Sequence, residues 1–579
     1  MAPLIRSPFF FTFAFVCTCM LLACHSQVPE ADLVIRGGTV ITMDDNQPEA
    51  QALAARGDTI LAVGSDEDVT AYIGSRTRVI ELGGATAMPG FIEGHGHFLG
   101  LGQAKMGLDL MNTKSWTEIV ALVQKAVQTA RPGEWIVGRG WHQEKWSSPP
   151  RPTVEGFPVH TALSAISPDN PVLLTHASGH ATIANAKAMN LAGITRRTPN
   201  PEGGEILHDA KGDPTGIFRE TAQQLVRRAR ADALARRTPD EIDADNRKAV
   251  SLAVKDCFAK GITSFQDAGA TFEEIDLFKM MADEESLGIR LWVMVRDSLF
   301  RLEQLFPRYR MIGYANNHLT VRAIKWSIDG ALGARGAWLL EPYSDLPSST
   351  GLNTASIDSI RASADLALKY DLQMCVHAIG DRANRETLDL FERALARRSE
   401  GPTLRWRIEH AQHLHPLDIP RFGKLGVIPA MQGIHCTSDA PYVIARLGQQ
   451  RAQQGAYVWR SLRETGAVIV NGTDAPVEDV NPIPSYYASV TRKLADGSLF
   501  FPDQRMTRQE ALRSYTLDAA YGAFEEGVKG SLVPGKLADI VILSGNPLTV
   551  PADSIPAIRV RSTIVGGDIV YEAPDDQLP

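Results

Sequence analysis

Through the middle of the chain, short apolar runs alternate with stretches whose apolar residues recur at helical spacing. The runs 290–295 and 373–377 have the length of buried strands, and the stretches 358–369 and 382–398 have the period of amphipathic helices. This alternation is typical of βα units, in which helices connect parallel strands. Further strands are expected at 264–266, 321–326, 405–408 and 467–471, and residues 507–510 fit a capping box opening the last long helix.

The α/β segment runs from residue 89 to residue 528. A bare (β/α)8 barrel of the TIM type needs only about 250 residues, so an insertion is expected within it. Residues 104–247 are the best candidate, because they are rich in Trp, Pro and Gly and show no clean βα rhythm.

Both ends of the chain have the residue pattern of short strands and turns. Residues 31–88 include two β-like runs separated by Gly37-Gly38, and residues 529–573 include a Gly566-Gly567 turn. Two β-rich ends that flank a long α/β middle predict one small β-sandwich assembled from both termini.

The pattern of the first residues indicates a targeting signal. Arg6 precedes an apolar run at 8–23 that is short for a membrane span, and Leu21-Leu22-Ala23-Cys24 resembles a bacterial lipobox. We expect residues 1–23 to be a lipoprotein-type signal peptide and Cys24 to be lipidated. His25 in place of Asp favours the outer membrane, with the protein on the periplasmic side of the bacterial envelope. The alternative is an ordinary cleaved signal with a chance cysteine.

Composition narrows the class of protein. Hydrophobic residues make up 44% of the chain and the formal net charge is −8 with no long basic run, so a nucleic-acid partner is not expected. Beyond the signal the cysteines are Cys257, Cys375 and Cys436, and none forms a CxxC pair. Neither a disulfide scaffold nor a cysteine–zinc site is indicated.

The sharpest chemical feature is the segment 89–97, Pro-Gly-Phe-Ile-Glu-Gly-His-Gly-His. Residues two apart in a strand face the same side, so His95 and His97 can converge on one metal ion. Gly94 and Gly96 remove side-chain bulk from the opposite face. An HxH pattern alone also fits two structural histidines.

With this segment, the runs 321–335 and 530–539 resemble the amidohydrolase superfamily, and specifically its amidohydrolase-3 branch, which includes YtcJ-like proteins and N-substituted formamide deformylases. The resemblance covers nearly the whole chain after the signal and implies a (β/α)8 barrel with metal at its mouth. Lys325 matches the lysine that CO2 carboxylates in many relatives, where it bridges two metals. The alternative is an unmodified lysine paired with Asp267 or Asp329.

The same resemblance assigns the remaining metal ligands and the catalytic group. His377 and His410 stand at the ends of the fifth and sixth expected strands, where a barrel places function. Asp474 follows the eighth strand and corresponds to the catalytic aspartate of the family. Imidazole and carboxylate ligands without thiolate favour zinc, one or two ions per chain, although manganese or iron suits the same residue types.

Weaker motifs surround this set. Substrate-contacting positions are expected at Trp141, His142 and His180 in the insertion and at Gln432 and His435 after the sixth unit. The alternative places the tryptophan in the insertion core and the histidines on the surface. His413 and His415 are expected to be solvated helix residues.

The expected reaction is hydrolysis of an amide-type C–N bond in an N-acyl or N-formyl substrate. Metal-activated water would attack, and Asp474 would transfer the proton. A deaminase or cyclic-amide hydrolase acting on a small heterocycle is the alternative. A non-catalytic, ligand-binding surface lipoprotein is the third class, and it has no need for the acid–base carboxylate. The partner is a small-molecule amide, and the sequence leaves a homodimer open.

Overall fold

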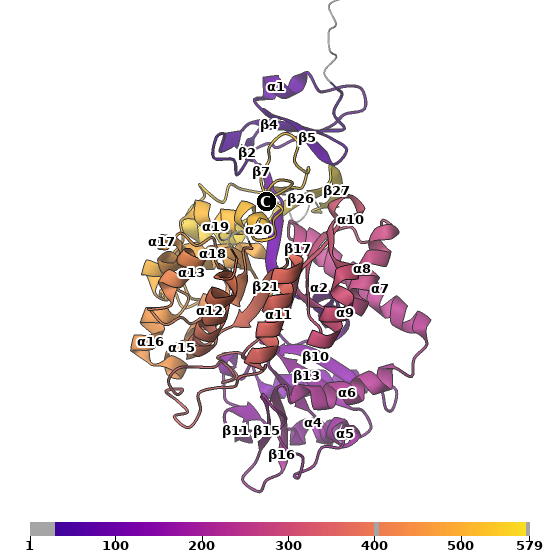
Figure 1. The fold of residues 1–579 in the computed structure, drawn as a ribbon. Helices are drawn as coiled ribbons and strands as arrows, with labels where there is room; N and C mark the ends of the chain where they lie inside the picture. Colours follow the sequence, from indigo (N-terminus) through magenta and orange to yellow (C-terminus); the bar gives the residue numbers. More distant parts are fainter. Residues whose placement is uncertain (1–28, 399–403, 575–579) are drawn as a thin grey trace, which may run out of the picture.

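The computed structural model describes residues 29–398 and 404–574. Its largest sheet contains eight parallel strands in the order β24–β23–β22–β21–β20–β18–β17–β8, and Figure 1 shows them at the centre of the molecule with helices outside. The strands are β8 (Phe91–Gly96), β17 (Ile262–Ala270), β18 (Arg290–Val295), β20 (Leu319–Ser327), β21 (Gln373–Ala378), β22 (Arg407–His410), β23 (Ile428–Gln432) and β24 (Val470–Gly472).

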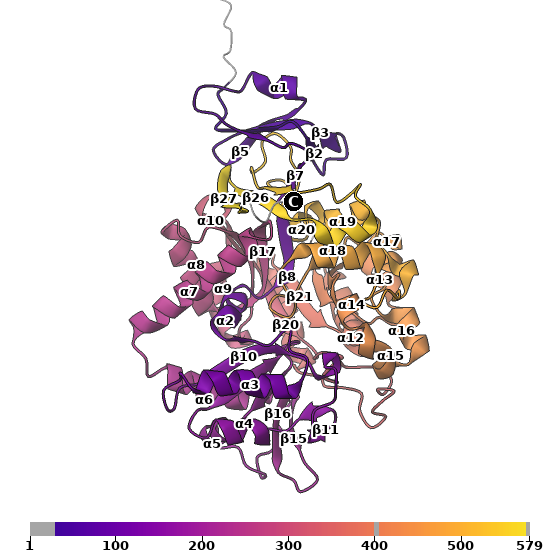
Figure 2. The same ribbon diagram turned by 180° about the vertical axis from the view of Figure 1, so that it is seen from behind.

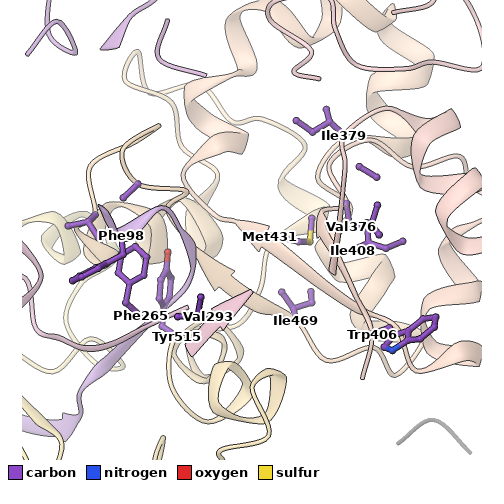
Figure 3. Packing of buried hydrophobic residues seen from close by; sticks show 14 of the residues in the cluster. Phe98, Phe265, Val293, Val376, Ile379, Trp406, Ile408, Met431, Ile469 and Tyr515 are labelled. Carbon is purple, nitrogen blue, oxygen red and sulfur yellow. The ribbon is translucent and has the colours of Figure 1, made fainter. Parts of the chain in front are cut away.

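These strands are buried on both faces, as parallel strands between a barrel interior and a helix layer must be. All six residues of β18 are buried, for example. The helices outside present one apolar stripe inward, including α8 (Phe272–Asp283), α9 (Leu299–Tyr309), α11 (Ile357–Tyr370), α12 (Asp381–Leu395), α13 (Ile419–Leu425) and α18 (Pro482–Thr491). Figure 3 shows part of the resulting core, in which Val376 and Ile408 of the paired strands β21 and β22 lie side by side.

The first and last strands of the sheet, β8 and β24, meet along a seam. The Asp474 N–H donates to the His95 carbonyl and the His97 N–H donates to the Ala475 carbonyl, each at 2.7 Å. A Cβ on Gly472 would lie 2.6 Å from the His95 nitrogen, so only glycine permits this approach. These contacts bring the eight strands into a nearly closed barrel, as expected for a TIM-type fold.

Both chain ends contribute to a small β-rich module at one end of the barrel (Figures 1 and 2). One sheet has the order β5–β4–β1–β6, and the other has the order β27–β26–β25–β7–β2–β3. The C-terminal β25 pairs antiparallel with the N-terminal β7, and one apolar cluster joins residues of both sheets. A sandwich arrangement of these sheets stays a prediction. The strands are β1 (Leu33–Arg36), β2 (Thr39–Ile41), β3 (Glu49–Ala50), β4 (Ala52–Arg56), β5 (Thr59–Gly64), β6 (Arg78–Glu81), β7 (Thr86–Pro89), β25 (Ile540–Leu543), β26 (Val560–Val565) and β27 (Asp568–Glu572).

The insertion lies at the opposite end of the barrel (Figures 1 and 2). It follows α2 (Phe98–Met106) and contains a six-stranded sheet with apolar clusters of its own. The predicted boundary at 247 falls inside α7 (Pro239–Phe258), which packs on α2 so closely that a Cβ on Gly102 would lie 1.8 Å from the Ala249 carbonyl oxygen. The sheet order is β15 (Gly204–His208), β16 (Pro214–Glu220), β14 (Ala181–Ala184), β13 (Val172–His176), β10 (Ile136–Trp141) and β9 (Leu108–Asp109).

Two local predictions need correction. The capping box at Thr507 is confirmed, but it opens the short α19 (Arg508–Ser514), which is followed by a separate α20 (Leu517–Gly522). The expectation that His413 and His415 lie in a solvated helix is wrong. His413 is 2% exposed beside Tyr457, and His415 is half-buried outside any helix.

Among the residues that the structure describes, none of the helices is both long enough and apolar enough to cross a bilayer. The predicted signal segment 1–23 and Cys24 lie outside the described residues. Lipidation, attachment to the outer membrane and the envelope location therefore stay predictions, as does a homodimer.

Candidate active site

A cavity of about 860 Å³ lies between the barrel and the insertion. The barrel contributes His97, Lys325 and Asp474 to its lining, and the insertion contributes Arg139 and His180. The barrel residues come from the carboxyl ends of the strands, which is where TIM-type barrels carry their active sites. Chemical groups of the barrel therefore face a chamber that the insertion covers.

His95, His410 and Asp474 form a buried group in which one ligand atom from each lies within 4.8 Å of the others. The Nε2 atom of His95 is 3.5 Å from Asp474 Oδ1, and the Nε2 atom of His97 is 3.3 Å from the same oxygen. The side chains come from β8, β22 and the turn after β24. Residues more than 300 positions apart in sequence thus place nitrogen and oxygen atoms that can bind a metal ion close together.

Backbone conformation at two strand ends contributes to this convergence. His410 has φ +74° and Asp474 has φ +56°, both in the left-handed region that non-glycine residues seldom adopt. Simple alternation along β22 would place His410 on the same face as the outward-packed Ile408. The unusual backbone at the strand end instead lets the imidazole face the cavity.

Two buried side chains orient the histidines. The carboxylate of Glu409 bonds to Nδ1 of His95, and Oε1 of Gln432 lies 2.7 Å from Nδ1 of His410. Both partners are acceptors, so each Nδ1 carries the proton and each Nε2 keeps a lone pair. This is the usual way in which outer side chains fix the tautomer of a metal-binding histidine.

Electrostatics favour the same ligand states. Burial lowers the pKa of His97 to about 4 and that of His410 well below its ordinary value, so both imidazoles are neutral at pH 7. Burial acts to raise the pKa of Asp474, but the neighbouring imidazoles of His95 and His97 outweigh it and hold that pKa well below the usual range. The site therefore combines neutral imidazoles with an ionised carboxylate.

The group fits a divalent metal ion. Within the described residues, His95 Nε2, His377 Nε2 and Asp474 Oδ1 are buried without a hydrogen-bond partner, and such atoms are costly unless something binds them. Imidazole nitrogen with carboxylate oxygen suits zinc and neighbouring transition metals. His95, His97, His410 and Asp474 would hold the ion.

Lys325 and His377 line the same cavity but lie outside this tight group. Lys325 is 2% exposed on β20, and burial lowers its pKa to about 8. His377 Nε2 is 3.5 Å from Asp329 Oδ1, and its ring centroid is 4.4 Å from that of His410. The oxygens of Asp329 accept the N–H groups of Trp338, Ile379 and Gly380 at 2.8–3.0 Å, so this carboxylate is already held by backbone.

The expected substrate-contacting residues divide into two groups. His180 lines the large cavity, with Nδ1 2.6 Å from Glu220 Oε2, and His142 and His435 line a small adjoining pocket with His410. Trp141 instead is fully buried in the insertion core, where its indole N–H donates to the Leu174 carbonyl. Gln432 positions His410, as described above.

Sequence reasoning missed three buried residues. Arg407 donates to Glu409 at 2.7 Å and so holds the carboxylate that orients His95. Glu93 accepts the Thr473 N–H at 2.7 Å and ties β8 to the turn before Asp474. Alternation would have found Glu93, which is two residues before His95 on the same strand face. Charged residues inside the β-run Arg407–His410 were the signal for the other two.

The comparisons with known proteins agree with this geometry. The amidohydrolase family model matches residues 78–571. The chain is 34% identical to the protein LONG AFTER FAR-RED 3 of Arabidopsis thaliana, with 93% of this chain and 92% of that protein covered. It is 30% identical to YtcJ of Bacillus subtilis (93% and 98% covered) and 27% identical to the N-substituted formamide deformylase of Arthrobacter pascens (93% and 98% covered).

Among solved structures, an uncharacterized metal-dependent hydrolase from Pyrococcus horikoshii has a TM-score of 0.70 at 26% identity, with 90% of this chain and 99% of that chain covered. The barrel, its mouth and these relatives define the class as metal-dependent hydrolase. The chain belongs to the amidohydrolase family, in the branch that includes YtcJ and the N-substituted formamide deformylases.

Proposed function

We propose that this protein hydrolyses an amide-type C–N bond in an N-acyl or N-formyl substrate, with Asp474 as the acid–base group. The observation that carries the proposal is the ionised, buried Asp474, whose Oδ1 lies within 3.5 Å of the Nε2 atoms of His95 and His97. The formamide deformylase of Arthrobacter pascens, which covers nearly the same length, supports this bond type.

The residues of the chain would act in a fixed order. His95, His97, His410 and Asp474 would hold a divalent ion, and when bound that ion would supply Lewis acidity that makes water a better nucleophile at neutral pH. Asp474 would accept a proton from the attacking water on its carboxylate and deliver it to the nitrogen as the C–N bond breaks. One water is consumed, and the products are a carboxylic acid and an amine. Glu409 and Gln432 keep the imidazoles of His95 and His410 aimed at the cavity throughout.

Carboxylation of Lys325 is the second part of the proposal. Burial disfavours the charged ammonium form, and the neutral amine is the form that adds CO2. The resulting carbamate would be an anion at the edge of the cavity, beside His377, and would offer oxygen ligands to a second metal ion.

Replacing Asp474 by Asn tests the acid–base assignment. The amide keeps the size of the side chain but cannot accept the proton, so kcat should fall by roughly a hundred- to ten-thousand-fold. Steady-state kinetics on N-formyl and N-acetyl amines, with metal content measured on the same samples, provide the readout.

The control is Asp503→Asn at an exposed position, which should keep normal turnover. Near-normal kcat in a folded, metal-loaded Asp474→Asn protein would contradict the mechanism. Release of ammonia from heterocycles, without turnover of N-acyl or N-formyl amines, would instead identify a deaminase.

A further inference from the structure

Four arginines line the cavity that contains Asp474: Arg139, Arg227, Arg230 and Arg296. They come from three separate places, because Arg139 is on β10, Arg227 and Arg230 are on α6 (Gln223–Leu234), and Arg296 follows β18. Arg227 and Arg230 are three residues apart and lie on one helix face. Barrel and insertion therefore both direct positive charge into the same chamber.

The carboxylates of this cavity make their direct contacts with groups other than these four arginines. Glu220 is bonded to His180 at 2.6 Å, and Asp297 pairs with Arg301 at 3.1 Å. Asp329 accepts backbone N–H groups, and Asp474 belongs to the metal-binding group. Each acidic group in the lining thus has another partner.

The hydrogen bonds that the arginines do make are to neutral acceptors. Arg139 donates to the carbonyls of Pro476 at 3.0 Å and Ala177 at 2.9 Å, which fixes its guanidinium two residues beyond Asp474. Arg227 donates to the side-chain amide of Gln223 at 2.9 Å. Nε of Arg230 is buried without a partner among the described residues.

The arginines are also close enough to repel one another. Burial lowers the pKa of Arg227, the neighbouring charges of Arg296 and Arg230 lower it further, and Glu220 offsets only part of this effect. Water solvates the exposed Arg296, but Arg227 and Arg230 are half-buried, so the gathered positive charge favours binding of a compensating anion. An anion that accepts charge-assisted hydrogen bonds from guanidinium groups is such a ligand.

We propose that the substrate is an acidic amide, whose carboxylate binds Arg227, Arg230 and Arg296 while its C–N bond lies at Asp474. This inference rests on the proposed function and adds the class of substrate to it. A carboxylate fits because its two oxygens match the paired N–H groups of a guanidinium. Arg139 is held beside the turn that contains Asp474, so it adds positive charge to the cavity on the side of the scissile bond.

Matched substrates provide the first test. N-acetylphenylalanine carries the carboxylate, and N-acetyl-2-phenylethylamine is the same amide without it. We expect kcat/KM for the acid to exceed that for the neutral amide by at least roughly tenfold, since hydrogen bonds to charged groups are among the strong ones. Equal or better turnover of the neutral amide would overturn the proposal.

Substitutions assign the preference to the arginines. Arg227→Gln and Arg296→Gln should each lower kcat/KM for the acid by roughly ten- to a hundredfold, mainly through KM, and leave the neutral amide within about twofold. Arg228→Gln is the matched control, because Arg228 lies one position along α6, is exposed and does not line the cavity. Equal losses for both substrates, or no loss in either variant, would contradict the assignment.

A binding measurement separates this inference from the proposed reaction. Calorimetry with 3-phenylpropionate and uncharged 3-phenylpropanol requires no turnover. Binding of the carboxylate that weakens in Arg227→Gln and Arg296→Gln supports the anion site, even if no amide is hydrolysed and the proposed function fails. Carboxylate binding that both variants leave unchanged would mean that the metal-binding group alone holds the anion, and the inference would be wrong.

Discussion

Among single residues, Lys325 shows how burial changes the chemistry of a side chain before any ligand arrives. It is 2% exposed on β20, and its pKa falls to about 8 because the ammonium is removed from water. The sequence predicted this placement, because Lys325 lies inside the expected strand 321–326. It could not predict that Asp329 would be held by backbone N–H groups, because those come from segments up to 51 residues away.

Lys325→Met should stabilise the metal-free protein at pH 7 by about 1–3 kcal/mol while abolishing most activity. The pKa of about 8 lies below the 10.5 of an unfolded lysine, so the folded state binds fewer protons between these values. Wild-type stability therefore rises with pH from 8 to 10.5, and the advantage of the variant is complete below pH 8. Thermal unfolding of both proteins at pH 7 and pH 10 measures this difference.

The matched control is Lys211→Met at an exposed position, which should show neither effect. Short carboxylates such as acetate should partly restore the activity of Lys325→Met if a carbamate is the working form. Unchanged kcat in the metal-loaded variant would contradict the role of this lysine.

Among strands and helices, alternation and apolar runs located the barrel strands except β23 (Ile428–Gln432), which was not expected, and they did not locate every strand end. The run 405–408 was expected as a strand, whereas β22 is Arg407–His410. The difference arises where Arg405, His410 and Ala411 take positive φ, a tertiary effect that local propensity does not encode. The same cause hid the inward direction of His410.

Gly472→Ala in β24 should destabilise the protein by about 1–3 kcal/mol, because the added methyl would lie 2.4 Å from Glu93 Oε1 and 2.6 Å from the His95 nitrogen. Activity should fall as well, since Asp474 is two residues away. Urea unfolding and kinetics on the same preparation provide the readout. Gly527→Ala is the control, because a Cβ there would meet nothing within 4 Å. Equal stability of the two variants would show that the backbone between β8 and β24 can move apart enough to accept the methyl group.

For the molecule as a whole, the pairing of the chain ends was predictable because both were β-rich, whereas the insertion sheet was not. That sheet mixes parallel and antiparallel pairs and includes the two-residue β9, so no period emerges along the sequence. The long-range contact that connects the end module to the barrel was equally hidden. Arg290 of β18 bonds to both oxygens of Asp539, at 2.7 and 3.0 Å, and both side chains are buried.

Asp539→Ala should cost about 3–5 kcal/mol, because it leaves the Arg290 charge buried and unpaired. Burial acts to raise the pKa of Asp539, but Arg290 outweighs it and holds that pKa below the ordinary 3.8. The contribution of the pair is therefore present above about pH 4 and is lost as the pH falls further. Urea unfolding at pH 7 and pH 3 should show a large difference between variant and wild type at pH 7 and a smaller one at pH 3. A constant difference would refute the ionic interpretation.

The seam between β8 and β24 has a consequence for how such a protein can fail. His95 and His97 stand on one side of it and Asp474 on the other, and the amides that join the two sides belong to these same residues. The barrel is thus closed by backbone groups of residues that belong to the candidate site or lie next to it. Separation of β8 from β24 would abolish activity before the rest of the barrel unfolds. Turnover should therefore be lost earlier in an unfolding experiment than the signal of the overall fold.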